Sequence, residues 1–205
     1  MGRPRSWRSR SCGAGNSVGT KRNATRGQSS VEFAASALVL ALLLFGIIDL
    51  GRAFYFAVGL TGAAREGARE ASWFDPSTGT NPFLYDGAIK SSVDGILTHS
   101  GLPTSVLANA SGTTCPSVAD SNSSYNPPYV DSVYPTDLNQ PLLYICYSNT
   151  PGLDLTTAPN NNSYKGTDIN VVLVLSLGFV SGFLSGLLGN SVHIVANTHM
   201  TVGGY

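Results

Sequence analysis

A long apolar segment is the clearest pattern in the chain. Residues 33–48 carry no charge and include a single polar residue, Ser36. As a helix they would rise about 24 Å, which is short of a hydrocarbon core of about 30 Å. The apolar pattern resumes after Asp49 and Arg52, two opposite charges that are three residues apart and can neutralise each other on one helix face. The sequence therefore predicts a membrane-spanning helix near residues 33–56, with aromatic residues at its outer end.

The helical pattern continues beyond this span through an alanine-rich segment with charges of both signs. Glu66 can pair with Arg69 at the i+3 position, whereas Arg65 and Arg69 are like charges at i,i+4 and disfavour an isolated helix. These charges either form a solvated face or meet partners outside the helix. Because a residue before proline disfavours helical geometry, the helix should end before Pro76, which gives one helix over residues 28–73.

The remainder of the chain, residues 74–205, has the pattern of a small α+β domain. Helical spacing of apolar residues predicts a short helix over residues 83–99. Aromatic and β-branched residues predict a strand near residues 142–147, and period-two alternation predicts half-buried strands near residues 168–177 and 191–203. The expected fold class is α+β: a long N-terminal transmembrane helix followed by a small antiparallel sheet.

An apolar, glycine-rich connection, residues 178–190, separates the last two predicted strands. Residues 169–189 carry no charge, so a second membrane span is the alternative assignment. The glycines and the alternation on both flanks favour the order strand, connection, strand. In that arrangement the connection exposes apolar side chains and forms an interaction surface.

The distribution of charge indicates the role of the N-terminal segment. The chain has zero formal net charge, but seven of its twelve basic residues precede Gln28, where there is no acid. A basic segment before an apolar helix is typical of membrane targeting, so residues 1–27 are predicted to be a leader. The positive-inside rule places the N-terminus in the cytoplasm and residues 74–205 outside. A nucleic-acid-binding arm and a simple secretory signal are disfavoured, because an apolar run follows the cations and no good small-x-small site follows the run.

Candidate chemistry is sparse. Cys115 and Cys146 lie in the part placed outside, where a disulfide would close a loop of about 30 residues and contribute roughly 3–4 kcal/mol. His193 and His199 share a predicted strand face but lie about 20 Å apart at 3.3 Å per residue, so they cannot bind one metal ion together. The sequence contains no nucleophile elbow, phosphate-binding loop or dinucleotide motif. We therefore expect no enzymatic activity, no metal site and no cofactor.

Three short motifs begin, interrupt and extend the predicted helix. They are RGQSSVEF at residues 26–33, GIIDLGRAF at residues 46–54 and AAREGAR at residues 63–69. Together they resemble the TadE-like family, which comprises bacterial pilin-like (pseudopilin) proteins of the tight-adherence, or Flp, pilus system. The similarity covers residues 26–71, and a weaker one lies in the C-terminal strand pair. The long basic leader and the Asn- and Pro-rich residues 75–165 depart from the family pattern.

The resemblance implies a prepilin whose dedicated peptidase cuts between Gly27 and Gln28, so that Glu32 becomes the fifth residue of the mature chain. In pilin-like proteins this glutamate serves processing or assembly by pairing with the N-terminal amine of a neighbouring subunit. A carboxylate next to hydrocarbon costs a few kcal/mol, which an adjacent ammonium would offset. Only one axial stagger brings the two charges together, so Glu32 and the neighbouring Phe33 are predicted to set the assembly register. The alternative is that Glu32 lies among headgroups, satisfied by water and Arg26.

The expected function is that of a pilin-like subunit or assembly component of a tight-adherence pilus in the bacterial cytoplasmic membrane. The expected partners are the membrane, a prepilin peptidase and other pilin-like subunits, with no nucleic acid and no small-molecule substrate. Five charged residues are predicted to make helix contacts: Asp49, Arg52, Arg65, Glu66 and Arg69. The alternative is a single-pass membrane-anchored extracytoplasmic binding module without a pilus role, which needs no cut at Gly27.

Overall fold

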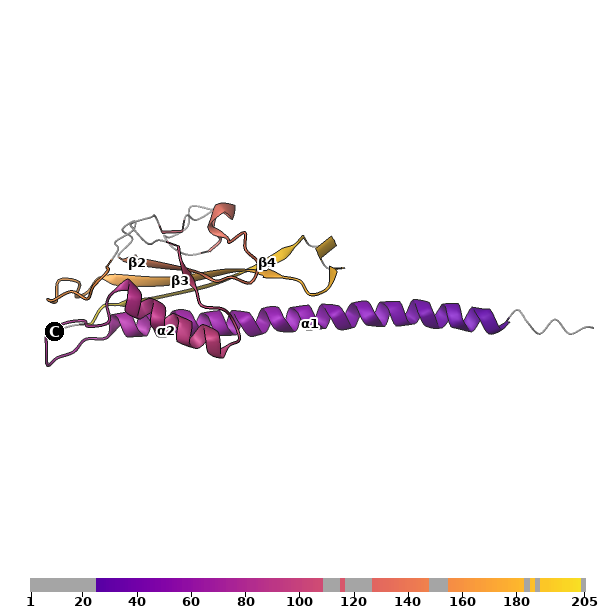
Figure 1. Cartoon of the computed structure of the whole chain (residues 1–205), viewed down its shortest axis with the longest axis horizontal. Coiled ribbons are helices and arrows are strands. Elements are labelled where there is room, and N and C mark those ends of the chain that lie inside the picture. Colours follow the sequence, from indigo (N-terminus) through magenta and orange to yellow (C-terminus); the bar gives the residue numbers. More distant parts are fainter. Residues whose placement is uncertain are drawn as a thin grey trace, which may run out of the picture. The chain divides into compact units, whose positions relative to one another are not determined.

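A computed structural model describes residues 25–108, 115–116, 127–147, 155–182, 185–186 and 189–203. Residues 1–24 of the predicted leader (residues 1–27) lie outside the described residues. The elements, in chain order, are α1 (Thr25–Ser72), α2 (Asp86–His99), β1 (Val106–Leu107), η1 (Asp131–Val133), β2 (Leu142–Tyr147), β3 (Asp168–Gly178) and β4 (Ser191–Thr201) (Figure 1). The architecture is α+β, as expected. The chain divides into two compact units, of which the first ends at Ala41 and the second begins at Leu42.

Helix α1 contains 48 residues and changes character along its length. Every residue from Gly27 to Ile48 is exposed or partly exposed, including most of the large apolar side chains. This part of α1 is long and apolar enough to cross a membrane. The helix ends at Ser72, before Pro76, where the residue preceding a proline disfavours helical geometry.

The C-terminal part of α1 belongs to the core of the second unit. Its buried residues recur at helical spacing and are mostly small: Leu60, Ala63, Ala64, Ala68 and Ala71. They pack with Ile89, Val93 and Leu97 of α2, which begins three residues later than predicted. In Figure 1, α2 lies alongside this part of α1, and the sheet covers both helices. Because alanine side chains are small, the backbone of α1 can approach its neighbours closely. A helix made mostly of small residues can therefore fill its place in a densely packed core.

The four-stranded sheet has the order β1-β2-β3-β4 and is mixed. β2, β3 and β4 pair antiparallel, as predicted, but β1 pairs parallel to β2, through Val106 with Leu142 and Leu107 with Leu143. The expectation of a purely antiparallel sheet is therefore wrong at this edge. A parallel pair needs a long crossover, and the connection between Leu107 and Leu142 provides one.

Strand β3 is buried on both faces, not on one as its alternation predicts. One face packs against α1 and α2 through Ile169, Val171, Leu173 and Leu175. The opposite face forms a second cluster, in which Val172 and Val174 meet Tyr129, Val133, Cys115 and Cys146. Even the polar residues Asn170 and Ser176 of this strand are buried. Residues before β2, such as Tyr129 and Val133, cover the face of β3 that the alternating pattern predicts to be exposed to solvent.

The pairing of β3 with β4 settles the assignment of the uncharged C-terminal segment. The two strands pair over eleven positions, from Asp168 with Thr201 to Gly178 with Ser191. Residues 169–178 are therefore a strand, and the prediction of strand, connection, strand is confirmed over the second membrane span.

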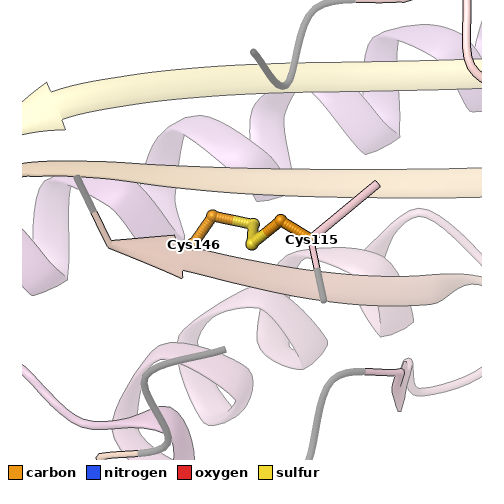
Figure 2. The surroundings of a disulfide bond; sticks show 2 residues. All are labelled: Cys115 and Cys146. Carbon is orange, nitrogen blue, oxygen red and sulfur yellow. A yellow bond between two sulfur atoms is a disulfide. The ribbon is translucent and has the colours of Figure 1, made fainter. Parts of the chain in front are cut away.

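Cys115 and Cys146 form a disulfide, as predicted, with their Cα atoms 6.0 Å apart. Figure 2 shows Cys146 on β2 and the bond reaching across to Cys115. Both side chains are buried within the second cluster. The disulfide thus fastens the segment around Cys115 to the face of the sheet that is turned away from the two helices.

Candidate functional site

The residues of the predicted processing site lie in the first turns of α1. The helix begins at Thr25, so the bond between Gly27 and Gln28 lies in a turn whose N–H groups have no intrahelical acceptor. The side-chain amide of Gln28 donates to Oε1 of Glu32 across 3.2 Å, and both residues are exposed. Phe33 is 75% exposed. The structure therefore places all four predicted residues on one short, open stretch of helix.

Asp49, the second acid of the apolar region, has an entirely different environment. Its exposed fraction is only 4%, although residues on either side of it in the sequence are exposed. The backbone N–H of Val180 donates to Oδ1 across 3.0 Å, and the backbone N–H of Ser181 donates to Oδ2 across 3.3 Å. The hydroxyl of Ser181 donates to Oδ2 across 2.7 Å. One carboxylate of α1 thus holds the start of the connection between β3 and β4.

Arg52 lies beside this carboxylate, as the sequence predicts, but it is not the main partner. Its Nη1 is 3.7 Å from Oδ1 of Asp49, and its guanidinium lies 5.7 Å from the ring centroid of Phe56. The neutral hydrogen-bond donors of residues 180 and 181 are closer to Asp49 than the cation is. A hydrogen bond to a charged group stabilises by roughly 1.5–3 kcal/mol, so three such donors can offset much of the cost of burying the carboxylate.

This contact was not predicted from the sequence. An acid inside an apolar helix signals that a partner is needed, but nothing in the local pattern indicates a partner 132 residues away. The sequence predicts that the glycine-rich connection is an interaction surface, and its residues 180 and 181 contact the chain's own helix α1.

The charged C-terminal part of α1 contains one strong ion pair. Arg69 donates to Glu66 through Nε at 2.9 Å and Nη2 at 2.5 Å, and lies 3.3 Å from Glu70. The hydrogen bonds from Arg69 hold the pKa of the Glu66 carboxyl below its ordinary value. The side chain of Arg65 is exposed and makes no ion pair within the part of the chain that the structure describes. Its charge is available to a partner.

A shallow hollow on the surface of α1 adjoins Arg65. It is lined by Ala57, Val58, Thr61, Gly62 and Arg65. Small side chains beside an unpaired cation suit the close approach of another helix that carries an acid.

The histidines do not form a site. His193 stacks on Tyr134 with ring centroids 4.1 Å apart and lies 3.1 Å from the hydroxyl of Ser176. His199 lies 3.5 Å from Asp168 on the exposed side of β4. Within residues 25–108 and the other described ranges, no group of three or more His, Cys, Asp or Glu side chains could hold a metal ion.

Comparison with known proteins identifies one segment of the chain. Residues 27–69 match the family described as TadE-like protein, which includes Gly27, Glu32, Asp49 and the ion pair of α1. No curated protein and no solved structure matches the chain. The match ends within α1 and leaves out α2 and the whole sheet. The family that the motifs suggest is thereby confirmed where those motifs lie: residues 27–69 are a TadE-like segment.

Proposed function

We propose that this chain is a pilin-like subunit or assembly component of a tight-adherence, Flp-type pilus. The observation that carries the proposal is the coincidence of the TadE-like match with the exposed, apolar part of α1. Within that stretch the chain presents a glycine, a glutamine and a glutamate at the spacing of a prepilin processing site. The basic leader supports an orientation with the N-terminus in the bacterial cytoplasm and the sheet domain outside.

Processing would change the partner of Glu32. In the unprocessed chain its carboxylate accepts a hydrogen bond from the neutral side-chain amide of Gln28. A cut between Gly27 and Gln28 creates an ammonium on Gln28, and charge-assisted hydrogen bonds are roughly twice as strong as neutral ones. Because Glu32 is exposed, the ammonium of a neighbouring copy can reach it. This supports an assembly contact that forms only after the leader is removed.

The shallow hollow near Arg65 supports a second contact between pilin-like chains. Its small side chains allow close helix packing, and Arg65 offers an uncommitted positive charge. A neighbouring α1 carries the partly exposed acids Glu66 and Glu70, which already face Arg69 and can accept Arg65 of another chain as a second cation.

The processing step can be tested by determining the N-terminus of the membrane-bound protein. We expect the mature chain to begin at Gln28, because the peptidase cuts in the first turn of α1, where backbone N–H groups lack helical partners. An intact leader, or a new N-terminus near Ala53, would contradict the proposal.

The role of Glu32 can be tested with a matched pair of substitutions. Glu32→Gln keeps a hydrogen-bonding partner for Gln28 but removes the charge, whereas Glu32→Asp keeps the charge. We expect Glu32→Gln to insert in the membrane and to abolish pilus assembly, measured in the sheared surface fraction. Glu32→Asp should retain part of the assembly. Normal pili in Glu32→Gln, with an uncut leader, would favour a membrane-anchored binding module instead.

A further inference from the structure

We propose that the start of the connection between β3 and β4 lies in the lipid headgroup layer of the membrane that α1 crosses, and that Asp49 holds it there. The segment concerned, residues 179–182, is called the docked turn below. The partner surface is a phospholipid bilayer. This inference rests on the proposed membrane anchoring by α1 and adds a second membrane contact from a different part of the chain.

The position of Asp49 along α1 sets the level of the docked turn. The apolar side chains just before it are exposed: Leu43 by 59%, Leu44 by 57%, Ile47 by 68% and Ile48 by 44%. Asp49 follows directly and is buried. Because each residue advances a helix by 1.5 Å, a turn bonded to Asp49 lies within a few ångströms of the end of the uncharged stretch, residues 33–48.

The length of the uncharged stretch places its end near the outer side of a bilayer. The uncharged stretch from Phe33 to Ile48 rises by about 24 Å, which is most of a hydrocarbon core of about 30 Å. Asp49 then lies near the outer boundary of the hydrocarbon, within a few ångströms of the headgroups. Phe54 and Tyr55 follow within two turns and are 72% and 56% exposed. Exposed aromatic side chains are typical of the membrane–water interface.

The docked turn meets the chemical requirements of that boundary. Backbone N–H groups cannot remain without acceptors near hydrocarbon, and those of Val180 and Ser181 are bonded to Asp49. The hydroxyl of Ser181 is bonded there as well. The side chain of Val180 points outward from the docked turn and is 64% exposed. Its polar groups are therefore satisfied inside the protein, and an apolar group faces out.

Arg52 supplies the complementary charge for lipid headgroups. Its side chain is one-third exposed and lies beside Asp49, the carboxylate that binds the docked turn. The three hydrogen bonds from residues 180 and 181 already satisfy much of the carboxylate, so the guanidinium keeps donors for a phosphate. Arginine suits this place, because its aliphatic stem can lie along apolar surface while its head binds phosphate.

The inference can be tested by placing a single tryptophan in the full-length chain reconstituted in phosphatidylcholine vesicles. Trp7→Phe and Trp73→Phe remove the two native tryptophans. Three reporters are then compared: Val180→Trp in the docked turn, Leu44→Trp in the exposed apolar stretch, and Thr201→Trp. Thr201 pairs with Asp168, at the opposite end of β3 and about 33 Å from Gly178. All three sites are exposed, so the substitutions should leave the fold intact, as circular dichroism can verify.

Quenching by lipids brominated on the acyl chains reports contact with the membrane. We expect Leu44→Trp to be quenched, Val180→Trp to be quenched by lipids brominated near the headgroup to roughly half that extent or more, and Thr201→Trp to be unaffected. Adding Asp49→Ala to the Val180 reporter should abolish most of its quenching, because the turn loses its attachment.

The outcomes separate the inference from the proposed function. If Leu44→Trp is quenched but Val180→Trp is not, the docked turn does not contact lipid and the inference is overturned, while membrane anchoring stands. If Leu44→Trp is not quenched, the anchoring itself fails. Equal quenching of Val180→Trp and Thr201→Trp, or quenching that persists in Asp49→Ala, would also overturn the role given to the docked turn and Asp49.

Discussion

At the residue scale, two acids in one apolar helix have opposite environments. Glu32 is exposed and accepts a hydrogen bond from Gln28, four residues away in the same helix. Asp49 is buried and accepts hydrogen bonds from Val180 and Ser181, which lie 131 and 132 positions further along the chain. Acids in membrane segments usually mark a function, and the two environments indicate two different functions. Glu32 is available to another chain, whereas Asp49 is committed to its own fold.

The two acids should therefore respond differently to removal. Asp49→Ala leaves three donors near residues 180 and 181 without their acceptor, and we expect a loss of roughly 3 kcal/mol in the free energy of unfolding, or about 6–12 °C in Tm. Glu32→Ala is the matched control on the same helix, and it should change Tm by less than about 1 °C. Thermal unfolding in detergent, followed by circular dichroism, measures both. Equal Tm values for the two variants would contradict the structural role of Asp49.

At the element scale, glycines decide how closely α1 packs on α2. A Cβ atom added to Gly67 would lie 2.6 Å from Cγ2 of Val93 and 3.4 Å from Cγ2 of Ile89. Gly67 is buried, and no real Cβ contact is as short as the first of these. In contrast, nothing lies within 4 Å of a Cβ added to Gly95, which is exposed within α2. The two glycines serve different purposes, although each occupies a helix interior.

Alanine substitution should separate these two roles by the sign of the effect. Overpacking costs about 1–3 kcal/mol, and alanine regains nearly 1 kcal/mol of helix propensity, so Gly67→Ala should destabilise by roughly 1 kcal/mol. Gly95→Ala meets no neighbour and should stabilise by up to about 1 kcal/mol. Urea unfolding of the two variants against the parent protein measures the difference. A stabilised Gly67→Ala would show that α2 can move away from α1 at no cost.

At the scale of the whole molecule, the sheet of the second unit is covered on both faces. Helices α1 and α2 cover one face, and the segments before β2 cover the other through Tyr129 and Val133. The disulfide between Cys115 and Cys146 is a covalent cross-link between this second cover and the sheet. The bond also requires an oxidising compartment, in agreement with the proposed location of the domain outside the cytoplasm.

Loss of the disulfide should destabilise the domain without unfolding the membrane helix. In the chain-entropy model, a loop of 31 residues corresponds to about 3–4 kcal/mol. Cys115→Ser combined with Cys146→Ser should therefore lower Tm by roughly 6–16 °C. Cys12→Ser is the control, since Cys12 belongs to the leader that processing would remove. Two free thiols in protein isolated from cells under alkylating conditions would argue against an exported domain.

The parts of this structure that the sequence predicts rest on local patterns. The long helix follows from its apolar run, and β2, β3 and β4 follow from residue type and alternation. The parts that escape prediction depend on contacts between distant segments. Strand β1 has only two residues and no periodicity. The second buried face of β3 could not be predicted, because polar residues such as Asn170 and Ser176 are typical of solvent-exposed positions. The hydrogen bonds from Ser181 to Asp49 could not be predicted either, because neither local sequence indicates the other residue as a partner.

The separation of Asp49 from its partners also has a consequence in time. Because synthesis runs from the N-terminus, Asp49 is made long before Ser181, which lies 132 residues further along the chain. At 5–20 residues per second, synthesis of that interval takes roughly 7–26 s. During this interval Arg52, three residues away on the same helix, is the charged partner within reach of Asp49. Under the proposed membrane anchoring, the bonds of Asp49 to the docked turn form only when the hairpin of β3 and β4 closes, so the depth of α1 would be fixed late in synthesis.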